Sequence, residues 1–196
     1  LYARPRRRFQ QTTQSQHASP IAPNRLAQDF MATAVNQKWL ADITYIPTGE
    51  GWLYLATVED LFSRSIVGWS MGTTLTDHLT CQALRMALAR RHPPEGLIHH
   101  SDRGGQYASA NYTALLQAAK ALQSMSATGN PYDNAPKESF FSRLKSELLP
   151  DRPFSTRHQA RLATFEYIEV FYNRQRLHSA LGYRSPLDFE ALHATS

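Results

Sequence analysis

The chain has 196 residues, of which 42% are hydrophobic and 19% are charged, and this composition suits one globular domain with an appendage. No apolar run approaches the roughly 18 residues of a membrane span, and the basic N-terminus lacks the apolar stretch of a secretory signal. The formal net charge of +5 is compatible with a polyanionic partner, although many basic proteins bind no nucleic acid. Composition thus argues against a membrane partner and leaves nucleic acid open.

Cysteine usage narrows the class of protein further. Cys81 is the only cysteine, which excludes an internal disulfide and any structural zinc site that needs two thiolates. A chain without disulfides suits a reducing compartment. We therefore expect a cytoplasmic protein without a zinc finger.

Positive charge gathers near both ends of the chain. Residues 1–35 are rich in Arg, Gln, Ser, Thr and Pro without a clear period, which is typical of an arm or linker that orders against a partner. The basic residues concerned are Arg6, Arg7, Arg8, Arg174, Arg176 and His178. A solvated tail and a solvated helix face explain them equally well, so charge alone does not decide for DNA.

Three strand-like segments come first after the arm. Residues 39–46, 52–62 and 65–72 are rich in β-forming residues, and turn residues separate them. Their close spacing predicts an antiparallel three-stranded meander.

Helices and strands then alternate. We expect helices over residues 76–91, 108–120, 136–149 and 156–176, and strands over residues 96–101 and 122–127. This order predicts an α/β fold with a mixed five-stranded sheet flanked by helices, which is the element order of the ribonuclease-H-like fold. The predicted organisation is a basic arm (1–35), a catalytic core (36–150) and a C-terminal helical extension (151–196).

Asp42 is an acidic residue in an apolar strand. Both sides of the strand over residues 39–46 are largely apolar, so the strand is predicted to be central and Asp42 to be at least partly buried. A buried carboxylate is costly unless it is paired or bound to a metal. The alternative is a structural aspartate bonded to nearby backbone or to Arg64.

Asp102 follows the strand over residues 96–101 and precedes Arg103, Gly104 and Gly105. Glycines beside an acid let the backbone and a phosphate approach closely, and ligands usually bind at strand ends in open sheets. The alternative is an aspartate that starts a turn before the next helix.

Glu138 lies in the first turn of the helix over residues 136–149, where an acidic residue simply suits the helix dipole. Together with Asp42 and Asp102, however, it can reach one edge of the sheet. Three converging carboxylates need a strong positive charge, and oxygen ligands select Mg²⁺ or Mn²⁺ over zinc. Two such ions serve phosphodiester chemistry.

Lys145 lies seven residues after Glu138, which is nearly two helical turns, so both project from one helix face. A lysine in this position is more often a solvated surface residue. Beside three acids, we expect it to hold a phosphate.

The segments 39–46, 99–107 and 129–141 resemble the three signature motifs of the integrase-core DDE transposases, of the group found in two-reading-frame bacterial insertion sequences. Residues 171–186 resemble the C-terminal motif of that group, and residues 12–30 resemble its arm. The resemblance covers nearly the whole chain. It implies a ribonuclease-H-like fold and a protein that nicks DNA at the ends of a mobile element and transfers those ends into new DNA.

The resemblance also assigns roles to residues. Asp42, Asp102 and Glu138 are the implied catalytic residues and ligands of two Mg²⁺ or Mn²⁺ ions, with Asp42 as the bridge. The implied partner is double-stranded DNA, bound by a homo-oligomer in a bacterial, nucleoid-associated setting. The implied DNA contacts, including those from the basic ends, are Arg6, Arg7, Arg8, Arg103, Asn130, Tyr132, Asn134, Lys145, Arg174, Arg176 and His178.

Two features depart from the family pattern. Family members carry a helix-turn-helix region upstream, so we expect end recognition by this chain to be weakened. Pro136 and Lys137 replace the small or hydrophobic pair expected before Glu138. Because proline fits a first helical turn, we expect little effect on Glu138.

Three other functions remain open at this stage. A ribonuclease-H-fold nuclease accounts for the acids but less well for the flanking motifs. A retroviral-type integrase normally has a His/Cys zinc module, which a single cysteine cannot build. A catalytically silent DNA-binding protein derived from a transposase is disfavoured because all three acids are present.

Overall fold

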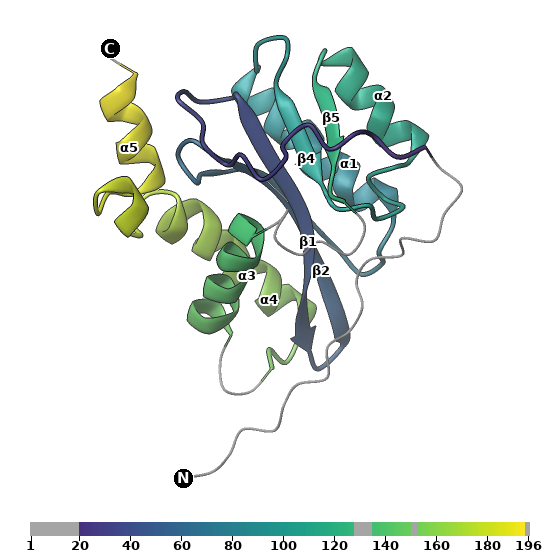
Figure 1. Ribbon diagram of the computed structural model, residues 1–196. Coiled ribbons are helices and arrows are strands. Elements are labelled where there is room, and N and C mark those ends of the chain that lie inside the picture. Colours follow the sequence, from purple (N-terminus) through teal and green to yellow (C-terminus); the bar gives the residue numbers. More distant parts are fainter. Residues whose placement is uncertain (1–19, 128–134, 150–152, 195–196) are drawn as a thin grey trace.

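The structure is built around a five-stranded sheet (Figure 1). A computed structural model describes residues 20–127, 135–149 and 153–194. Along the chain the described elements are β1 (Lys38–Thr48), β2 (Gly51–Asp60), β3 (Ile66–Gly72), α1 (Asp77–Arg91), β4 (Ile98–Ser101), α2 (Ala110–Ala118), β5 (Leu122–Met125), α3 (Ala135–Leu148), α4 (Arg157–Glu166), the π-helix η2 (Tyr167–Tyr172), the 3₁₀-helix η3 (Ser179–Leu181) and α5 (Pro186–His193).

The strand order is β3-β2-β1-β4-β5. Strands β1, β2 and β3 form an antiparallel meander, while β4 pairs parallel with β1 and β5 pairs parallel with β4. The sheet is therefore mixed, with β1 as its middle strand. The predicted meander, the central first strand and the order of strands and helices through α3 are confirmed.

Helices cover both faces of the sheet. One core joins Trp39, Ala41 and Ile43 of β1 to α1 and α2, and the other joins Ile46 of β1 to α3, α4 and η2. Because successive side chains of a strand point to opposite faces, Asp42 projects toward the face that α3 covers. The fold thus aims this acid at the helix that carries Glu138.

The predicted helix over residues 156–176 is observed as a continuous helical run over 157–172, whose second half is a π-helix. Helix α4 ends at Glu166, η2 follows, and α5 begins only at Pro186. Asn173 follows the last residue of η2, and its buried side-chain amide accepts the Ile66 N–H at 2.9 Å and donates to the Ile66 carbonyl at 3.0 Å. These bonds tie the chain to the first residue of β3 at the point where the helical run ends.

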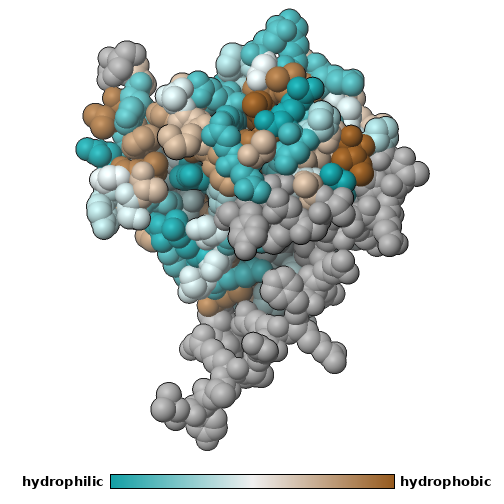
Figure 2. Space-filling view, in the orientation of Figure 1, coloured by the Kyte–Doolittle hydropathy of each residue, from teal (hydrophilic) through white to brown (hydrophobic). Residues whose placement is uncertain are grey.

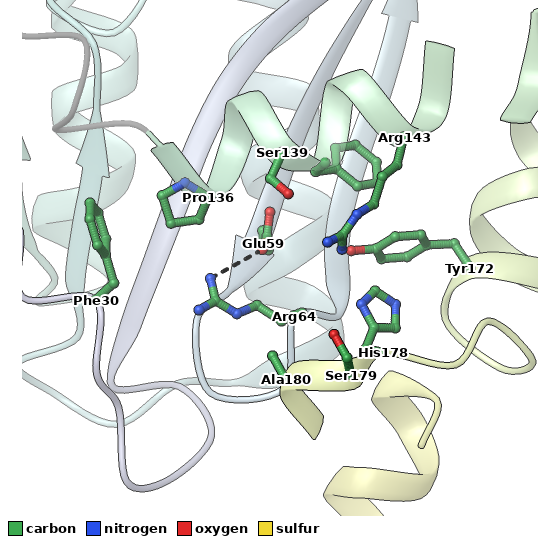
Figure 3. A pocket seen from close by; sticks show the side chains of 11 residues that line it. Phe30, Glu59, Arg64, Pro136, Ser139, Arg143, Tyr172, His178, Ser179 and Ala180 are labelled. Carbon is green, nitrogen blue, oxygen red and sulfur yellow. Dashed lines mark ion pairs between the residues drawn. The ribbon is translucent and has the colours of Figure 1, made fainter. Parts of the chain in front are cut away.

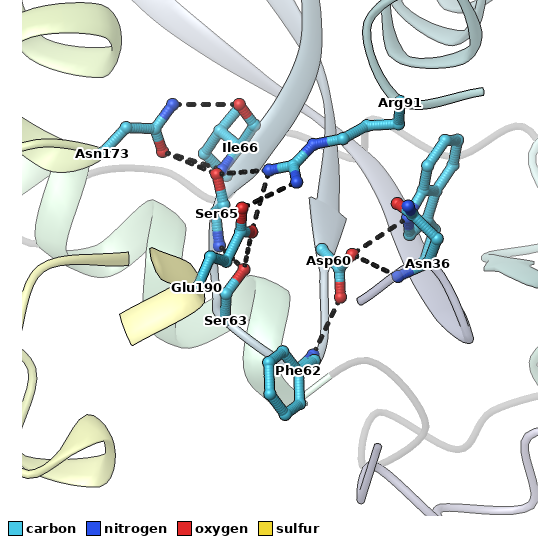
Figure 4. Close-up of polar contacts among 10 residues, drawn as sticks. Asn36, Asp60, Phe62, Ser63, Ser65, Ile66, Arg91, Asn173 and Glu190 are labelled. Atoms are coloured by element: carbon cyan, nitrogen blue, oxygen red, sulfur yellow. Dashed lines mark hydrogen bonds and ion pairs between the residues drawn. The ribbon is translucent and has the colours of Figure 1, made fainter. Parts of the chain in front are cut away.

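A second attachment holds α5 to the sheet (Figure 4). The carboxylate of Glu190 accepts two bonds from the Arg91 guanidinium, at 2.7 and 2.8 Å, and a third from the Ser63 hydroxyl. Arg91 also donates to the Ser65 hydroxyl at 3.2 Å. The last turn of α1, the turn between β2 and β3, and α5 therefore form one connected unit.

Residues 20–37 cross the structure without helix or strand. The Ser124 hydroxyl accepts the backbone N–H of Arg25 at 2.8 Å and that of Leu26 at 3.2 Å, which ties this segment to β5. The division into arm (1–35), core (36–150) and extension (151–196) stays a prediction.

The visible surface is mostly polar, with apolar residues scattered among polar ones (Figure 2). Scattered exposed apolar side chains are normal for a folded protein. In the ranges that the structure describes, no helix is long and apolar enough to cross a membrane.

The Asn173 attachment is testable by replacing Asn173 with alanine. This change leaves the buried N–H and carbonyl of Ile66 without partners, and we expect it to lower the free energy of unfolding by about 2–4 kcal/mol. Urea unfolding measures the effect. Asn111→Ala, which removes an exposed bond to Asp77, is the matched control and should cost less than about 0.5 kcal/mol. Equal stability of the two variants would contradict this role of Asn173.

Candidate active site

The parallel pairing of β1 and β4 brings Asp42 and Asp102 together. Ala41 and Ser101 are Cα partners in this pairing, and the two acids are the next residue on each strand. Adjacent strands lie roughly 4.8 Å apart, so the acids emerge side by side where β4 ends. Both side chains are half-buried.

Local backbone bonds orient the two carboxylates. Oδ1 of Asp42 accepts the Ile43 N–H at 2.7 Å, and Oδ1 of Asp102 accepts the Gly104 N–H at 2.9 Å. A Cβ atom at Gly104 would stand 3.0 Å from Asp102 Oδ1. A side chain at position 104 would therefore crowd the carboxylate, which explains the glycine beside this acid.

The charges of both acids act on the buried hydroxyl of Tyr107. Burial raises the pKa of Tyr107 well above its usual range, and the charges of Tyr112, Asp42 and Asp102 add to the effect. Both carboxylates therefore act on one buried phenol, which agrees with their placement by strand register.

Lys137 is the unexpected residue of the site. Its side chain is fully buried, and its ammonium lies 2.9 Å from Thr57 Oγ1 and 3.5 Å from Glu59 Oε2. Thr57 is the Cα partner of Asp42 across the β1–β2 ladder. Burial lowers the pKa of Lys137, whereas the carboxylates of Glu59 and Asp42 raise it. The Lys137 ammonium lies within salt-bridge distance of the Glu59 carboxylate.

Arg64 takes a different partner from the one considered for it. Its guanidinium lies 3.8 Å from Glu59 Oε1. Asp42 instead makes the backbone bond described above. The bond from the Ile43 N–H agrees with the alternative of a structural aspartate bonded to nearby backbone.

Glu138 follows Lys137 in the first turn of α3, and its side chain is exposed. Across residues 20–127, 135–149 and 153–194, no three His, Cys, Asp or Glu side chains lie close enough together to hold one metal ion. The structure therefore brings Asp42 beside Asp102 and leaves Glu138 outside that pair.

Sequence reasoning missed the role of Lys137, although a signal was present. Lys137, Phe141, Leu144 and Leu148 recur at the spacing of one helix face, and this is the face that packs on the sheet. A lysine on the apolar stripe of a helix needs a buried acceptor. The expectation that Pro136 and Lys137 have little effect overlooked this requirement.

The predicted DNA contacts lie in several settings. The ammonium of Lys145 stands 4.7 Å from the centre of the Tyr45 ring on β1. Arg103 donates from Nε to the Ser126 carbonyl, and the exposed Arg174 donates to the Glu169 carbonyl at 3.1 Å. The residues Arg6, Arg7, Arg8, Asn130, Tyr132 and Asn134 lie outside the described residues.

The side chains of Arg176 and His178 make contacts within the protein. Arg176 binds the Glu147 carboxylate through Nε and Nη2, with the shortest contact at 2.7 Å. His178 is buried against the Tyr172 ring, and burial lowers its pKa to about 4. A neutral, buried imidazole is poorly suited to binding phosphate as a cation.

Comparison with known proteins shows which class of protein the chain resembles. Two models described as integrase core domain match the chain, one over residues 32–131 and the other over residues 119–186. The catalytic core domain of HTLV-2 integrase, solved in complex with magnesium, has a TM-score of 0.62 over 82% of this chain and 99% of its own, at 16% identity. An integrase chain of the simian T-cell lymphotropic virus intasome has a TM-score of 0.67 over 91% of this chain and 61% of its own, at 18% identity. The fold is thus the ribonuclease-H-like fold of integrase catalytic cores.

Closer relatives narrow the class. The transposase of IS904 from Lactococcus lactis is 49% identical over 97% of this chain and 75% of its own length. The transposase InsF of IS3A from Escherichia coli is 50% identical over 97% and 66%, and a 31 kDa protein of IS600 from Shigella sonnei is 50% identical over 96% and 70%. The chain belongs to the integrase-core family of insertion-sequence transposases, and it is a transposase catalytic core, a polynucleotidyl transferase.

The buried ion pair is testable by a double-mutant cycle. Lys137→Met leaves the buried Glu59 carboxylate with only the Arg64 guanidinium, 3.8 Å away, so we expect a loss of about 3–5 kcal/mol in unfolding free energy. Adding Glu59→Gln removes that buried charge and should restore part of the loss, so the two effects will not sum. Chemical denaturation measures all four proteins. Additive losses would show that the two side chains do not interact.

Proposed function

We propose that Asp42, Asp102 and Glu138 together bind two divalent cations, Mg²⁺ or Mn²⁺, and that this site cleaves DNA at the ends of an insertion sequence and joins those ends to target DNA. The observation that carries the proposal is the strand register that sets Asp42 beside Asp102. Two half-buried carboxylates at a strand end repel one another, and a bound cation relieves that repulsion.

The donor chemistry fits hard cations. Carboxylate oxygens are the ligands that Mg²⁺ and Mn²⁺ prefer. A further sign of strong negative charge is the buried Lys137 ammonium, which donates to Thr57, the residue opposite Asp42 in the β1–β2 ladder. When bound, two such ions activate the attacking oxygen and stabilise the leaving oxygen of a phosphodiester.

The remaining roles belong to the residues around the acids. Asp42, on the middle strand, is the proposed bridging ligand, with Asp102 to one side and Glu138 brought in from α3. Lys145 lies on the same side of α3 as Glu138, where its ammonium can hold the phosphate beside the reacting bond. The Gly104 N–H keeps the Asp102 carboxylate oriented toward the site.

DNA binding extends the site on both sides. Arg103 and Lys145 lie near the acids, and the proposed outer contacts come from Arg174 and from residues outside the described ranges, namely Arg6, Arg7, Arg8, Asn130, Tyr132 and Asn134. Arginines and lysines supply the salt-dependent part of DNA affinity. We propose that a homo-oligomer assembles on the DNA ends.

The alternative functions are less well supported. A related nuclease shares the acids, but relatives about 50% identical over nearly the whole chain are transposases. A catalytically silent DNA-binding protein has no need to retain Asp42, Asp102 and Glu138 together. The transposase site therefore explains more of the chain.

The decisive variant is Glu138→Gln, tested in a strand-transfer assay with Mg²⁺. Losing a metal ligand removes several kcal/mol of transition-state stabilisation, so we expect joining to fall by roughly a thousandfold while DNA binding stays close to normal. Glu166→Gln makes the same charge change at an exposed position on α4 and should retain activity. Wild-type joining by Glu138→Gln would remove Glu138 from the site.

A further inference from the structure

A cavity of about 330 Å³ lies between α3 and the C-terminal segment (Figure 3). Phe140 and Arg143 of α3 line it together with Tyr172 and His178 of the C-terminal segment, and the rings of Phe140 and Tyr172 are in contact. Its volume falls in the range of small-ligand sites, roughly 300–1,000 Å³. The cavity lies on the side of α3 away from Lys145, so the roles proposed above for the acids do not use it.

Two buried polar atoms at this cavity make no hydrogen bond. Glu59 and His178 are 2% and 3% exposed. Within the part of the chain that the structure describes, Glu59 Oε2 and His178 Nε2 have no hydrogen-bond partner, although Glu59 Oε2 keeps its looser ion pair with Lys137. Buried polar atoms are nearly always bonded to protein, water or ligand, so these two atoms offer hydrogen-bonding capacity to a molecule that enters the cavity.

Arg64 enters the cavity from a strained position. It stands in the turn between β2 and β3 with a φ of 63°, a left-handed conformation that is unfavourable for a side chain of this size. Such strain clusters at functional sites because surrounding structure must hold it in place. The result is a guanidinium that faces Glu59 across the cavity, at a distance too long for a hydrogen bond.

Arg143 supplies a second guanidinium from α3 (Figure 3). Among the described residues it makes no salt bridge with a carboxylate. Two arginines thus share a cavity with one carboxylate, and Lys137 already partners that carboxylate from below. The cavity carries net positive charge and retains a strong acceptor at its floor.

These groups match the parts of a nucleotide. Two guanidinium groups bind a phosphate through paired N–H donors. The Glu59 carboxylate accepts from the amino group of a base, and the rings of Phe30, Phe140 and Tyr172 offer apolar and stacking contacts. An inorganic anion would use the arginines but would supply no donor to the Glu59 carboxylate.

The position of the cavity sets it apart from the proposed metal site. Pro136 and Ser139 lie at the cavity, and both belong to the helical turn that carries Glu138. Its lining also includes His178, Ser179 and Ala180, from the C-terminal motif that the catalytic acids do not explain. The cavity and Glu138 therefore lie on opposite faces of the same helical turn, so the cavity is a separate site from the one proposed for the reacting phosphate.

We propose that this cavity receives one unpaired nucleotide of the DNA substrate, with its phosphate between Arg64 and Arg143 and its base against Glu59. The inference rests on the proposed function only in taking DNA as the substrate. Taking a base out of the stack costs free energy, and this cost is smallest where the base is already unpaired. The protein should therefore prefer DNA that carries an unpaired base near its end.

The test measures binding by the full chain in EDTA, so that no metal-dependent step contributes. Labelled duplexes are compared with duplexes that differ only by one extrahelical base at stepped distances from the 3′ end. We expect the wild type to bind one of these duplexes about tenfold more tightly than the paired one, and Ala180→Trp, which fills the cavity from its exposed rim, to lose that preference.

Arg143→Gln tests the phosphate contact. We expect it to weaken binding of the preferred duplex about tenfold, as the loss of a charge-assisted hydrogen bond does. Arg85→Gln removes the same charge from an exposed position on α1 and is the control for general electrostatics. Equal affinities of these two variants, or a preference that survives Ala180→Trp, would overturn the proposal.

Two further experiments distinguish nucleotide binding in the cavity from anion binding and from a failure of the proposed function. Competition by deoxyadenosine monophosphate should exceed that by inorganic phosphate, and equal competition would reduce the cavity to an anion site and refute the nucleotide. Asp42→Asn should lose joining and keep the preference for the unpaired base. If Asp42→Asn loses joining while even the wild type lacks that preference, only the cavity inference fails.

Discussion

The buried ammonium of Lys137 is the contact on which the geometry of this protein depends. A fully buried cation is tolerated only with close acceptors, and Thr57 and Glu59 of β2 supply them. Since Lys137 lies in the first turn of α3, these contacts fix where that helix meets the sheet. Glu138, the next residue, is thereby directed outward beside the strand that holds Asp42.

The same contact joins the two sites on either side of α3. Glu59 contacts Lys137 through Oε2 and faces Arg64 at the cavity through Oε1, while Thr57 lies directly across the ladder from Asp42. The polar pair therefore lies between the proposed metal site and the cavity. The attachment of Asn173 to Ile66 brings the C-terminal motif over that pair and closes the cavity.

Much of this arrangement could be predicted because it rests on local pattern. Alternation placed the strands, and parallel pairing of two of them accounts for Asp42 beside Asp102. The attachment at the end of the helical run could not be predicted, because it is a bond between Asn173 and a residue 107 positions away. Lys137 escaped notice for the same reason, since its acceptor Thr57 is 80 positions distant. A lysine in a first helical turn resembles a surface residue until the packing is known.

The central claim is that Asp42, Asp102 and Glu138 form one cation site. The most direct measurement is anomalous diffraction from crystals of the protein bound to DNA and soaked in Mn²⁺. Two peaks roughly 3.5–4 Å apart, with Asp42 between them and Glu138 bound to one ion, are the predicted result. Ordered DNA with no peak between Asp42 and Asp102, or with peaks that Glu138 does not contact, would contradict the account.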